Sequence, residues 1–335
     1  MTSASAPRFF QAYVVDREPA GGLRAGLLRR DIRELGTSGV LLRVCYSSLN
    51  YKDALAAQAA PGIVKTLPHV PGIDACGYVV GEEAAGPMLV TGYGLGTEIW
   101  GGYGDYVRLP AEWLLPIPAG LSPRDSMILG TAGLTAALSV TALLDAGLDP
   151  GRGEVLVTGA TGGVGMLAVM LLAHLGFRVV AQTRKPEAAS VLTARGAAAV
   201  VTAERDGQGP VKPLHKIRWA GAIDTVGGPI LAQVLREVGY GGTVATCGMV
   251  AGTDFTSSVF PFILRAARLI GIDSVQCPRA LRETLWARLA TVWRLPDLAL
   301  IAPPLHREGL TTALAALRRG ERMGRTLVIV GGDGA

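Results

Sequence analysis

The fold of this chain is decided by residues 154–165, which read EVLVTGATGGVG. An apolar run, Glu154–Thr158, leads directly into a glycine-rich turn, and the apolar run that follows, Val164–Leu175, has the length of a helix. Glycines let the backbone turn sharply and approach a pyrophosphate, and the start of the following helix offers free N–H groups and a partial positive charge. The stretch therefore predicts a strand, a phosphate-binding turn and a helix, with a tight turn that holds no ligand as the alternative.

Downstream of this stretch, short apolar runs continue to alternate with helical segments. Strands that are buried on both faces read as continuous apolar runs, so the alternation predicts a doubly wound parallel sheet. The predicted strands are Arg178–Gln182, Ala198–Thr202, Gly221–Thr225, Gly242–Cys247 and Arg268–Asp273. The predicted helices are Glu187–Arg195 and Ile230–Val238, and beyond the sheet Arg279–Val292 and Gly309–Arg319.

Upstream, residues 1–125 have the texture of a β-rich domain with irregular loops. Val40–Val44 and Ile73–Val80 are predicted strands, and Ser122 is a predicted helix N-cap because Pro123 follows it in the first turn. The chain is thus expected to have an α/β fold. Residues 1–125 are predicted to form the first part of the β-rich domain, residues 126–275 the cofactor domain, and residues 276–335 a return to the β-rich domain.

Size and composition exclude several classes of protein. Cores rarely grow as one unit beyond about 250–300 residues, so 335 residues suit two domains. Hydrophobic residues make up 49% and charged residues 18%, which excludes intrinsic disorder. The net charge is +5, but the basic residues form no block or stripe, so nucleic acid is not an expected partner.

The cysteines and the apolar stretches bear on location. The four cysteines form no CxxC pair, which predicts reduced thiols in the cytoplasm. Ser126–Leu144 and Val155–Phe177 lack formal charge and are long enough to cross a bilayer, but glycines and hydroxyl residues interrupt them. We expect no membrane span, and the N-terminus has no sustained apolar region that would predict a signal peptide.

The end of the second predicted strand of the sheet indicates which dinucleotide binds. Thr183-Arg184-Lys185 offers a hydroxyl and two cations where an NAD site places an acidic residue for the ribose 2′-hydroxyl. This favours NADPH, with a solvated basic turn as the alternative. None of the four histidines lies at ligand spacing from another histidine or a cysteine, so no metal site is expected.

Several further motifs together resemble one family. The chain is similar to the zinc-independent, quinone-oxidoreductase-like branch of the medium-chain dehydrogenase/reductases, and most closely to the acrylyl-CoA reductases. The matching stretches are Ser47–Leu55, Val70–Asp74, Trp100–Gly102, Gly130–Ala136, Trp219–Gly227, Pro261–Arg265, Gly271–Val275 and Gly324–Val328. The resemblance implies a GroES-like catalytic domain interrupted by a Rossmann domain, and a homodimer. It also implies that Asn50 and Ile73 stand where zinc-dependent relatives carry metal ligands.

The resemblance assigns roles residue by residue. It implies that Tyr51 and Thr131 lie at the nicotinamide end of the cofactor, and that Asn50 and Asp53 shape the same catalytic pocket. The remaining cofactor positions that it implies are Thr161, Gly162, Gly163, Val164, Thr183, Arg184, Lys185, Gly248, Met249, Ile263, Ser274 and Arg325. Structural alternatives stay open, because Asn50 could hold a turn, Asp53 could cap a helix, and Thr131 could bond to its own backbone.

The resemblance implies reduction of a carbonyl-conjugated C=C bond in a short enoyl-CoA, with Tyr51 or water as the proton donor. Acrylyl-CoA reductases usually carry Glu-Asn-His before Trp-Gly-Gly, whereas this chain has Thr97-Glu98-Ile99, and Ala199 replaces an arginine near the 2′-phosphate. These departures keep open an enone or quinone substrate. A cofactor-bound protein with a structural or nucleic-acid-binding role is the third alternative.

Overall fold

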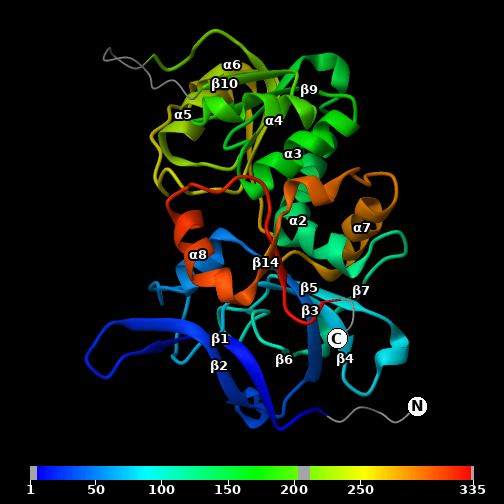
Figure 1. The fold of residues 1–335 in the computed structure, drawn as a ribbon. Coiled ribbons are helices and arrows are strands. Elements are labelled where there is room, and N and C mark those ends of the chain that lie inside the picture. Colours follow the sequence, from blue (N-terminus) through cyan, green and yellow to red (C-terminus); the bar gives the residue numbers. More distant parts are fainter. Residues whose placement is uncertain (1–5, 203–211, 333–335) are drawn as a thin grey trace. The chain divides into compact units, whose positions relative to one another are not determined.

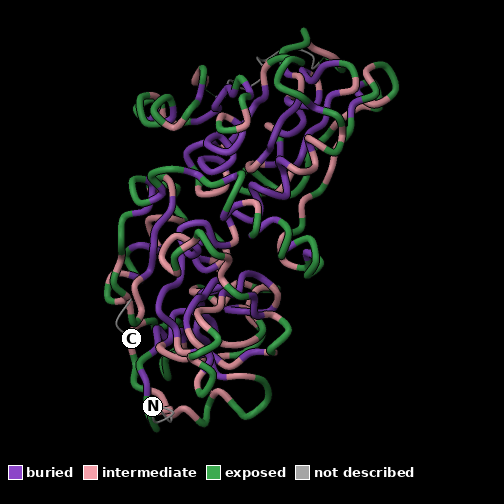
Figure 2. The backbone as a smooth tube through the Cα atoms, turned by 90° about the vertical axis from the view of Figure 1, so that its right-hand side faces the viewer, coloured by how far each residue is buried: buried purple, intermediate pink, exposed green. Residues whose placement is uncertain are grey.

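A computed structural model describes residues 6–202 and 212–332 (Figure 1). The chain forms two compact units. The β-rich unit comprises residues 1–131, 275–291 and 296–335, and the Rossmann unit comprises residues 132–274 and 292–295. Both units contain buried segments, which Figure 2 draws in purple.

The Rossmann unit is built on a six-stranded sheet in which every pairing is parallel. Its strand order is β10-β9-β8-β11-β12-β13, so the predicted doubly wound sheet is confirmed. The order reverses between β8 and β11, and in such sheets ligands bind beside the carboxyl ends of the strands at that point. The strands are β8 (Glu154–Val157), β9 (Arg178–Thr183), β10 (Ala199–Thr202), β11 (Trp219–Asp224), β12 (Val238–Thr246) and β13 (Arg268–Gly271).

Helices connect these strands, as the alternation predicts. A Cβ atom at Gly165 would collide with the carbonyl oxygen of Gly159, so only glycine lets the first turn of α3 pack on the end of β8. The helices are α3 (Gly163–His174), α4 (Ala189–Ala194), α5 (Gly228–Glu237) and α6 (Phe260–Arg265). The short α6 was not predicted, because six residues carry too little periodicity.

The β-rich unit contains two sheets. A two-stranded antiparallel sheet pairs β1 (Phe9–Arg17) with β2 (Leu23–Asp31). The larger sheet runs β14-β15-β3-β4-β5-β7, and β6 also pairs with β3. Its strands are β3 (Val40–Ser48), β4 (Asp74–Val79), β5 (Met88–Thr91), β6 (Tyr106–Leu109), β7 (Leu115–Pro116), β14 (Pro304–His306) and β15 (Leu327–Ile329).

Three helices belong wholly to the β-rich unit, and seven 3₁₀ turns are spread over the described residues. The helices are α1 (Tyr51–Ala56), α7 (Arg279–Ala290) and α8 (Leu310–Arg318). The 3₁₀ turns are Ile32–Leu35, Glu83–Ala85, Ala111–Trp113, Pro150–Arg152, Pro186–Ala188, Leu298–Ile301 and Arg307–Gly309. The predictions for α7 and α8 are confirmed, whereas α1 was not predicted as a helix.

The long helix α2 (Pro123–Asp145) connects the two units along the chain. Ser122 accepts the N–H of Asp125, so the predicted N-cap is confirmed. The backbone of α2 departs from helical geometry at Gly130, where φ is 51° and ψ is −152°. Among the described residues, α2 is the one helix long and apolar enough to cross a membrane, and 78% of its apolar stretch is buried in the protein.

Candidate active site

The glycine-rich turn lies at the carboxyl end of β8, where the strand order reverses. Gly159 adopts a left-handed φ of 59°, which favours glycine. Gly162 is the N-cap of α3 and supplies no side-chain cap, so the first N–H groups of that helix face no capping side chain. This backbone arrangement fits a pyrophosphate. The predicted Thr161, Gly162, Gly163 and Val164 belong to this turn and the first turn of α3.

Hydrogen bonds join the carboxyl ends of β8 and β11 beside this turn. Thr158 donates its hydroxyl to Asp224 Oδ1 over 2.7 Å, and its carbonyl oxygen accepts the hydroxyl of Thr225 over 2.9 Å. Asp224 also accepts the N–H of Gly227 and the hydroxyl of Thr246, and burial raises its pKa. These hydrogen bonds fix the edge of the sheet on which the glycine-rich turn lies.

The basic turn after β9 is connected to the glycine-rich turn. Thr161 Oγ1 and Thr183 Oγ1 are 3.3 Å apart, and Thr183 Oγ1 accepts the N–H of Lys185 over 3.0 Å. Arg184 is exposed and Lys185 is half-buried. The turn therefore presents two cations next to the phosphate-binding backbone, which fits the 2′-phosphate of NADPH.

The other predicted cofactor positions of the Rossmann unit are scattered over its later elements. Gly248 follows β12, and a Cβ atom there would collide with the backbone of Thr225, so this glycine lies against the carboxyl end of β11. Met249 and Ile263 are exposed, and Ser274 accepts the hydroxyl of Thr135 over 2.9 Å. Gly248 and Met249 both lie against the backbone that follows β11, and the cofactor roles of all four residues stay predictions.

The β-rich unit holds a buried polar cluster around Asp74, the first residue of β4. Its carboxylate accepts hydrogen bonds from the Ser48 hydroxyl, from Asn50 Nδ2 over 2.8 Å, and from the Thr131 hydroxyl over 2.5 Å. The N–H of Thr131 also points at both carboxylate oxygens over 3.0 Å. The Thr131 hydroxyl therefore donates to Asp74. A Cβ atom at Gly130 would strike Asp74 Oδ2, so the break in α2 makes room for this carboxylate.

Asp53 is the second buried carboxyl group of the cluster. It accepts the N–H groups of Asn50, Gly72 and Ile73 over 2.8, 3.1 and 2.9 Å, and it lies 3.0 Å from the Tyr103 hydroxyl. Its bond to Asn50 caps α1, so this structural interpretation is confirmed, and the same carboxyl also fixes the loop before β4. Burial, with Asp74 nearby, raises the pKa of Asp53 to about 7.

Arg325 supplies the positive charge of the cluster. It donates from Nε to the carbonyl oxygen of Ile128 over 2.8 Å, and from Nη1 to the carbonyl oxygen of Leu49 and to Asn50 Oδ1 over 3.1 Å each. Burial lowers its pKa, while Asp74 and Asp53 oppose this effect. Its Nη2 is buried and has no hydrogen-bond partner among the described residues, with Asp74 Oδ2 4.0 Å away. An orphaned donor of this kind fits the polar end of a bound ligand.

Tyr51 differs from its neighbours because it is 36% exposed at the first position of α1, directly after Asn50. The structure thus brings together Asn50, Asp53, Thr131 and Arg325, while the placement of Tyr51 at the nicotinamide stays a prediction. Sequence reasoning missed Ser48, Asp74 and Tyr103 as members of the cluster. The signal was present, because all three lie in or beside motifs that carry the family resemblance.

Metal and thiol chemistry find little support in the described residues. Within them, no group of three or more histidine, cysteine, aspartate or glutamate side chains could hold a metal ion. The four cysteines, all within the described residues, form no disulfide bond, and burial raises the pKa of Cys247 to about 12. That thiol is therefore a poor nucleophile at neutral pH.

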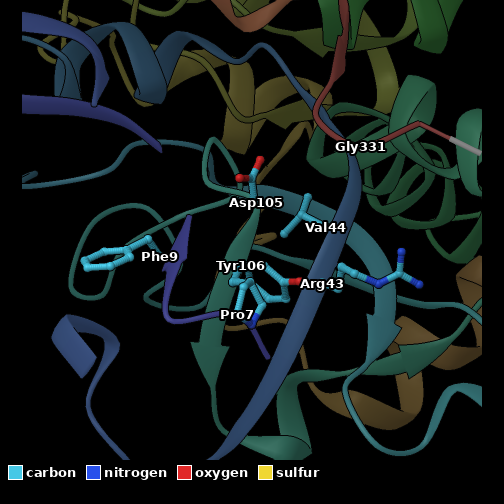
Figure 3. Close-up of a pocket in the computed structure, with 7 residues that line it drawn as sticks. All are labelled: Pro7, Phe9, Arg43, Val44, Asp105, Tyr106 and Gly331. Carbon is cyan, nitrogen blue, oxygen red and sulfur yellow. The ribbon is translucent and has the colours of Figure 1, made fainter. Parts of the chain in front are cut away.

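A surface pocket of the β-rich unit is distinct from the polar cluster. It has a volume of about 320 Å³ and shares no lining residue with the cluster (Figure 3). Its carboxylate, Asp105, already pairs with Arg307 over 2.6 Å and accepts the N–H of Gln11. It is lined by Pro7, Phe9, Arg43, Val44, Asp105, Tyr106 and Gly331.

Comparison with known proteins covers almost the whole chain. Residues 36–119 match the family described as alcohol dehydrogenase GroES-like domain, and residues 163–291 match zinc-binding dehydrogenase. The chain is 41% identical to the acrylyl-CoA reductase AcuI of Ruegeria pomeroyi over 96% of this chain and 99% of the relative. It is 43% identical to the putative quinone oxidoreductase YhfP of Bacillus subtilis over 88% and 91%.

Two solved structures extend the likeness. The Escherichia coli YhdH structure with bound NADPH has a TM-score of 0.89 and 41% identity, with 96% of this chain and all of that chain covered. The Bacillus subtilis yhfP structure with bound NAD has a TM-score of 0.91 and 40% identity, with 96% and 99% covered.

Proposed function

Because the chain belongs to the quinone-oxidoreductase-like branch of the medium-chain dehydrogenase/reductases, we propose that it is an NADPH-dependent reductase of carbonyl-conjugated C=C bonds. A short enoyl-CoA such as acryloyl-CoA is the proposed substrate. The observation that carries the proposal is the pairing of a phosphate-binding glycine turn with a basic turn at one sheet edge, in a chain 41% identical to an acrylyl-CoA reductase.

The proposed reaction is a conjugate reduction that needs no metal. NADPH, when bound, supplies a hydride to the β-carbon of the alkene. Negative charge then develops on the substrate carbonyl oxygen, and donors aimed at that oxygen stabilise it. In the β-rich unit, Arg325 Nη2 is a buried cationic donor without a partner among the described residues. We assign Arg325 to this charge, with Asn50 and Asp74 orienting its guanidinium group.

Turnover assays test the proposal directly. Purified protein is expected to oxidise NADPH with acryloyl-CoA, and addition of EDTA should leave the rate unchanged. Crotonyl-CoA, a simple quinone and NADH serve as comparisons at one fixed protein concentration. Turnover with the quinone alone would contradict the enoyl-CoA assignment and favour the alternative function below.

Reduction of another enone or of a quinone is the alternative function. Thr97-Glu98-Ile99 replaces the run expected of an acrylyl-CoA reductase, and Glu98 is engaged with Lys65 over 3.1 Å. The turn that carries these residues packs on the backbone beside Asp53, since Gly96 abuts Gly72. A changed turn next to the cluster therefore supports a changed substrate, as does the quinone-oxidoreductase name of a relative.

Tyr51 is the proposed donor of the proton that completes the reduction at the α-carbon. General acids typically contribute about 10²–10⁴-fold to a rate. We expect Tyr51→Phe to lower kcat about a hundredfold with little change in the KM for NADPH. Tyr240→Phe, which alters an exposed tyrosine of the Rossmann unit, is the matched control. An unchanged kcat in Tyr51→Phe would identify water as the donor.

Arg184 and Lys185 are the proposed 2′-phosphate clamp, with Thr183 as the hydroxyl between them and the glycine-rich turn. A hydrogen bond to a charged group contributes about 1.5–3 kcal/mol, or roughly 10- to 150-fold in affinity. Arg184→Ala should therefore raise the KM for NADPH at least about tenfold and leave the KM for NADH unchanged. Arg178→Ala, at the opposite end of the same strand, should change neither value. Equal loss for both cofactors would argue against the clamp.

An apolar surface of the Rossmann unit bears on the assembly of the protein. β13 is the last strand of the sheet order, and α6 and the residue before it expose the apolar side chains of Val259, Phe260, Ile263 and Leu264. An open strand edge next to an apolar patch is typical of a protein–protein contact. We propose a homodimer through this side of the Rossmann unit, in the cytoplasm, with the domains at 1–125 plus 276–335 and at 126–275.

A further inference from the structure

The hydroxyl group of Tyr103 lies between two oxygen atoms that ordinarily accept. It is 3.1 Å from the carbonyl oxygen of Ser48 and 3.0 Å from Asp53 Oδ2, and the tyrosine is completely buried. A phenol carries one proton, and a backbone carbonyl oxygen never donates. With Asp53 ionised, either the Ser48 carbonyl oxygen loses the Tyr103 proton, or the phenol oxygen faces Asp53 Oδ2 at 3.0 Å with no proton between the two oxygen atoms.

We propose that Asp53 carries a proton in the working enzyme and donates it to Tyr103, which donates its own proton to the Ser48 carbonyl. Tyr103 is then a positioning residue that holds Asp53 in its neutral form. This chain of bonds satisfies every group, since Asp53 still accepts the N–H groups of Asn50, Gly72 and Ile73. It also ties the end of β3 to the start of α1 and to the loop before β4.

The charges around Asp53 agree with a neutral acid. The titratable groups that face it are Tyr103, Asp74 and Arg325. With Asp53 neutral, Asp74 and Arg325 balance each other; with Asp53 ionised, the buried cluster carries one uncompensated negative charge, which is costly in a low-dielectric interior. Burial and the nearby Asp74 both raise the pKa of Asp53, which agrees with the proton that the hydrogen bonds assign to this carboxyl group.

Asp224 of the Rossmann unit provides a contrast within the same chain. It is also buried, but its partners are the hydroxyls of Thr158 and Thr246 and the N–H groups of Val226 and Gly227. All four groups can donate to Asp224 at the same time, because the Thr158 hydroxyl gives its own proton to Asp224 and receives the N–H of Thr225. Asp224 therefore needs no proton, and burial alone does not produce the arrangement seen at Asp53.

A neutral Asp53 matters for the chemistry only if the proposed function is correct. Conjugate reduction places negative charge on the substrate carbonyl oxygen, which we assign to Arg325. A second buried carboxylate beside Asp74 would oppose that charge. The enzyme form with neutral Asp53 is therefore the active one, and its share falls about tenfold for each pH unit above the pKa of Asp53.

Infrared spectroscopy of the intact protein tests the proton directly. We expect the carbonyl stretch of a protonated carboxyl group in wild type at about pH 6, with loss of the band as the pH rises through about 7. The band should be absent from Asp53→Asn and present in Asp224→Asn. In Tyr103→Phe it should move to higher frequency, because the acid loses its acceptor. Absence of the band from wild type, or an unchanged band in Tyr103→Phe, would overturn the proposal.

Kinetics then separate this inference from the proposed function. In wild type, kcat should fall above neutral pH, and in Asp53→Asn, whose amide carries no charge at any pH, this fall should be absent. A titrating band with no turnover on any enone or quinone would leave the proton assignment standing and refute the proposed function. Turnover whose pH profile is the same in wild type and Asp53→Asn would overturn the link between the proton and catalysis.

Discussion

Arg325→Met is expected to lower the free energy of unfolding of the protein by about 3–5 kcal/mol. Removing one member of a buried charge pair leaves the other buried without compensation, and losses of about this size are typical. Here Arg325 is 3% exposed, and its removal also leaves the carbonyl oxygens of Ile128 and Leu49 without this donor. Urea denaturation followed by tryptophan fluorescence measures the loss.

Two further variants make this prediction specific. Arg325→Lys keeps the charge but loses the forked geometry, so its loss should be smaller than that of Arg325→Met. Arg319→Met removes an exposed arginine that pairs with Glu321, and surface changes of this kind usually stay within about 0.5 kcal/mol. A loss in Arg325→Met no larger than in Arg319→Met would mean that Asp74 is not held by this cation.

The cofactor half of the site could be predicted because its signal is local. The glycine-rich turn, its strand and its helix occupy 21 consecutive residues, Glu154–His174, and the basic turn follows one strand later. Periodicity and glycine placement determine such a unit before any tertiary contact is known. Apolar runs also predicted the six parallel strands, but they gave no signal for α1 and α6, which are single short helices stabilised by their neighbours.

The buried cluster could not be derived in this way, because its members come from distant parts of the chain. Arg325 lies 275 residues from Asn50, and they meet because β15 pairs with the end of β3, with Leu327 opposite Ser48. Asp74 and Tyr103 were visible only as parts of motifs. The carboxylate of Asp74 at a strand end and the phenol of Tyr103 in a loop are expected to be solvated until the sheet register shows that they are buried together.

Asp53→Asn should remove a pH dependence from the stability of the protein. The pKa of this carboxyl is about 7 in the folded protein and 3.8 when unperturbed. Between these values the unfolded chain has lost the proton while the folded protein keeps it, so wild type becomes less stable as the pH rises. Each unit corresponds to about 1.4 kcal/mol, which gives roughly 4 kcal/mol over the whole interval. The stabilisation is complete below about pH 4 and is lost by about pH 7.

The amide introduced by Asp53→Asn cannot ionise, so the variant should gain about 4 kcal/mol relative to wild type between about pH 4 and pH 8. Denaturant unfolding at several pH values measures this difference, and Asp145→Asn, at an exposed position, controls for the change in net charge. A constant difference across the range would mean that Asp53 is ionised in the folded protein throughout. The direction matters more than the size: a carboxylate that is salt-bridged and ionised in the folded protein would leave the stability of wild type nearly constant over this interval, whereas a buried neutral acid makes it fall as the pH rises.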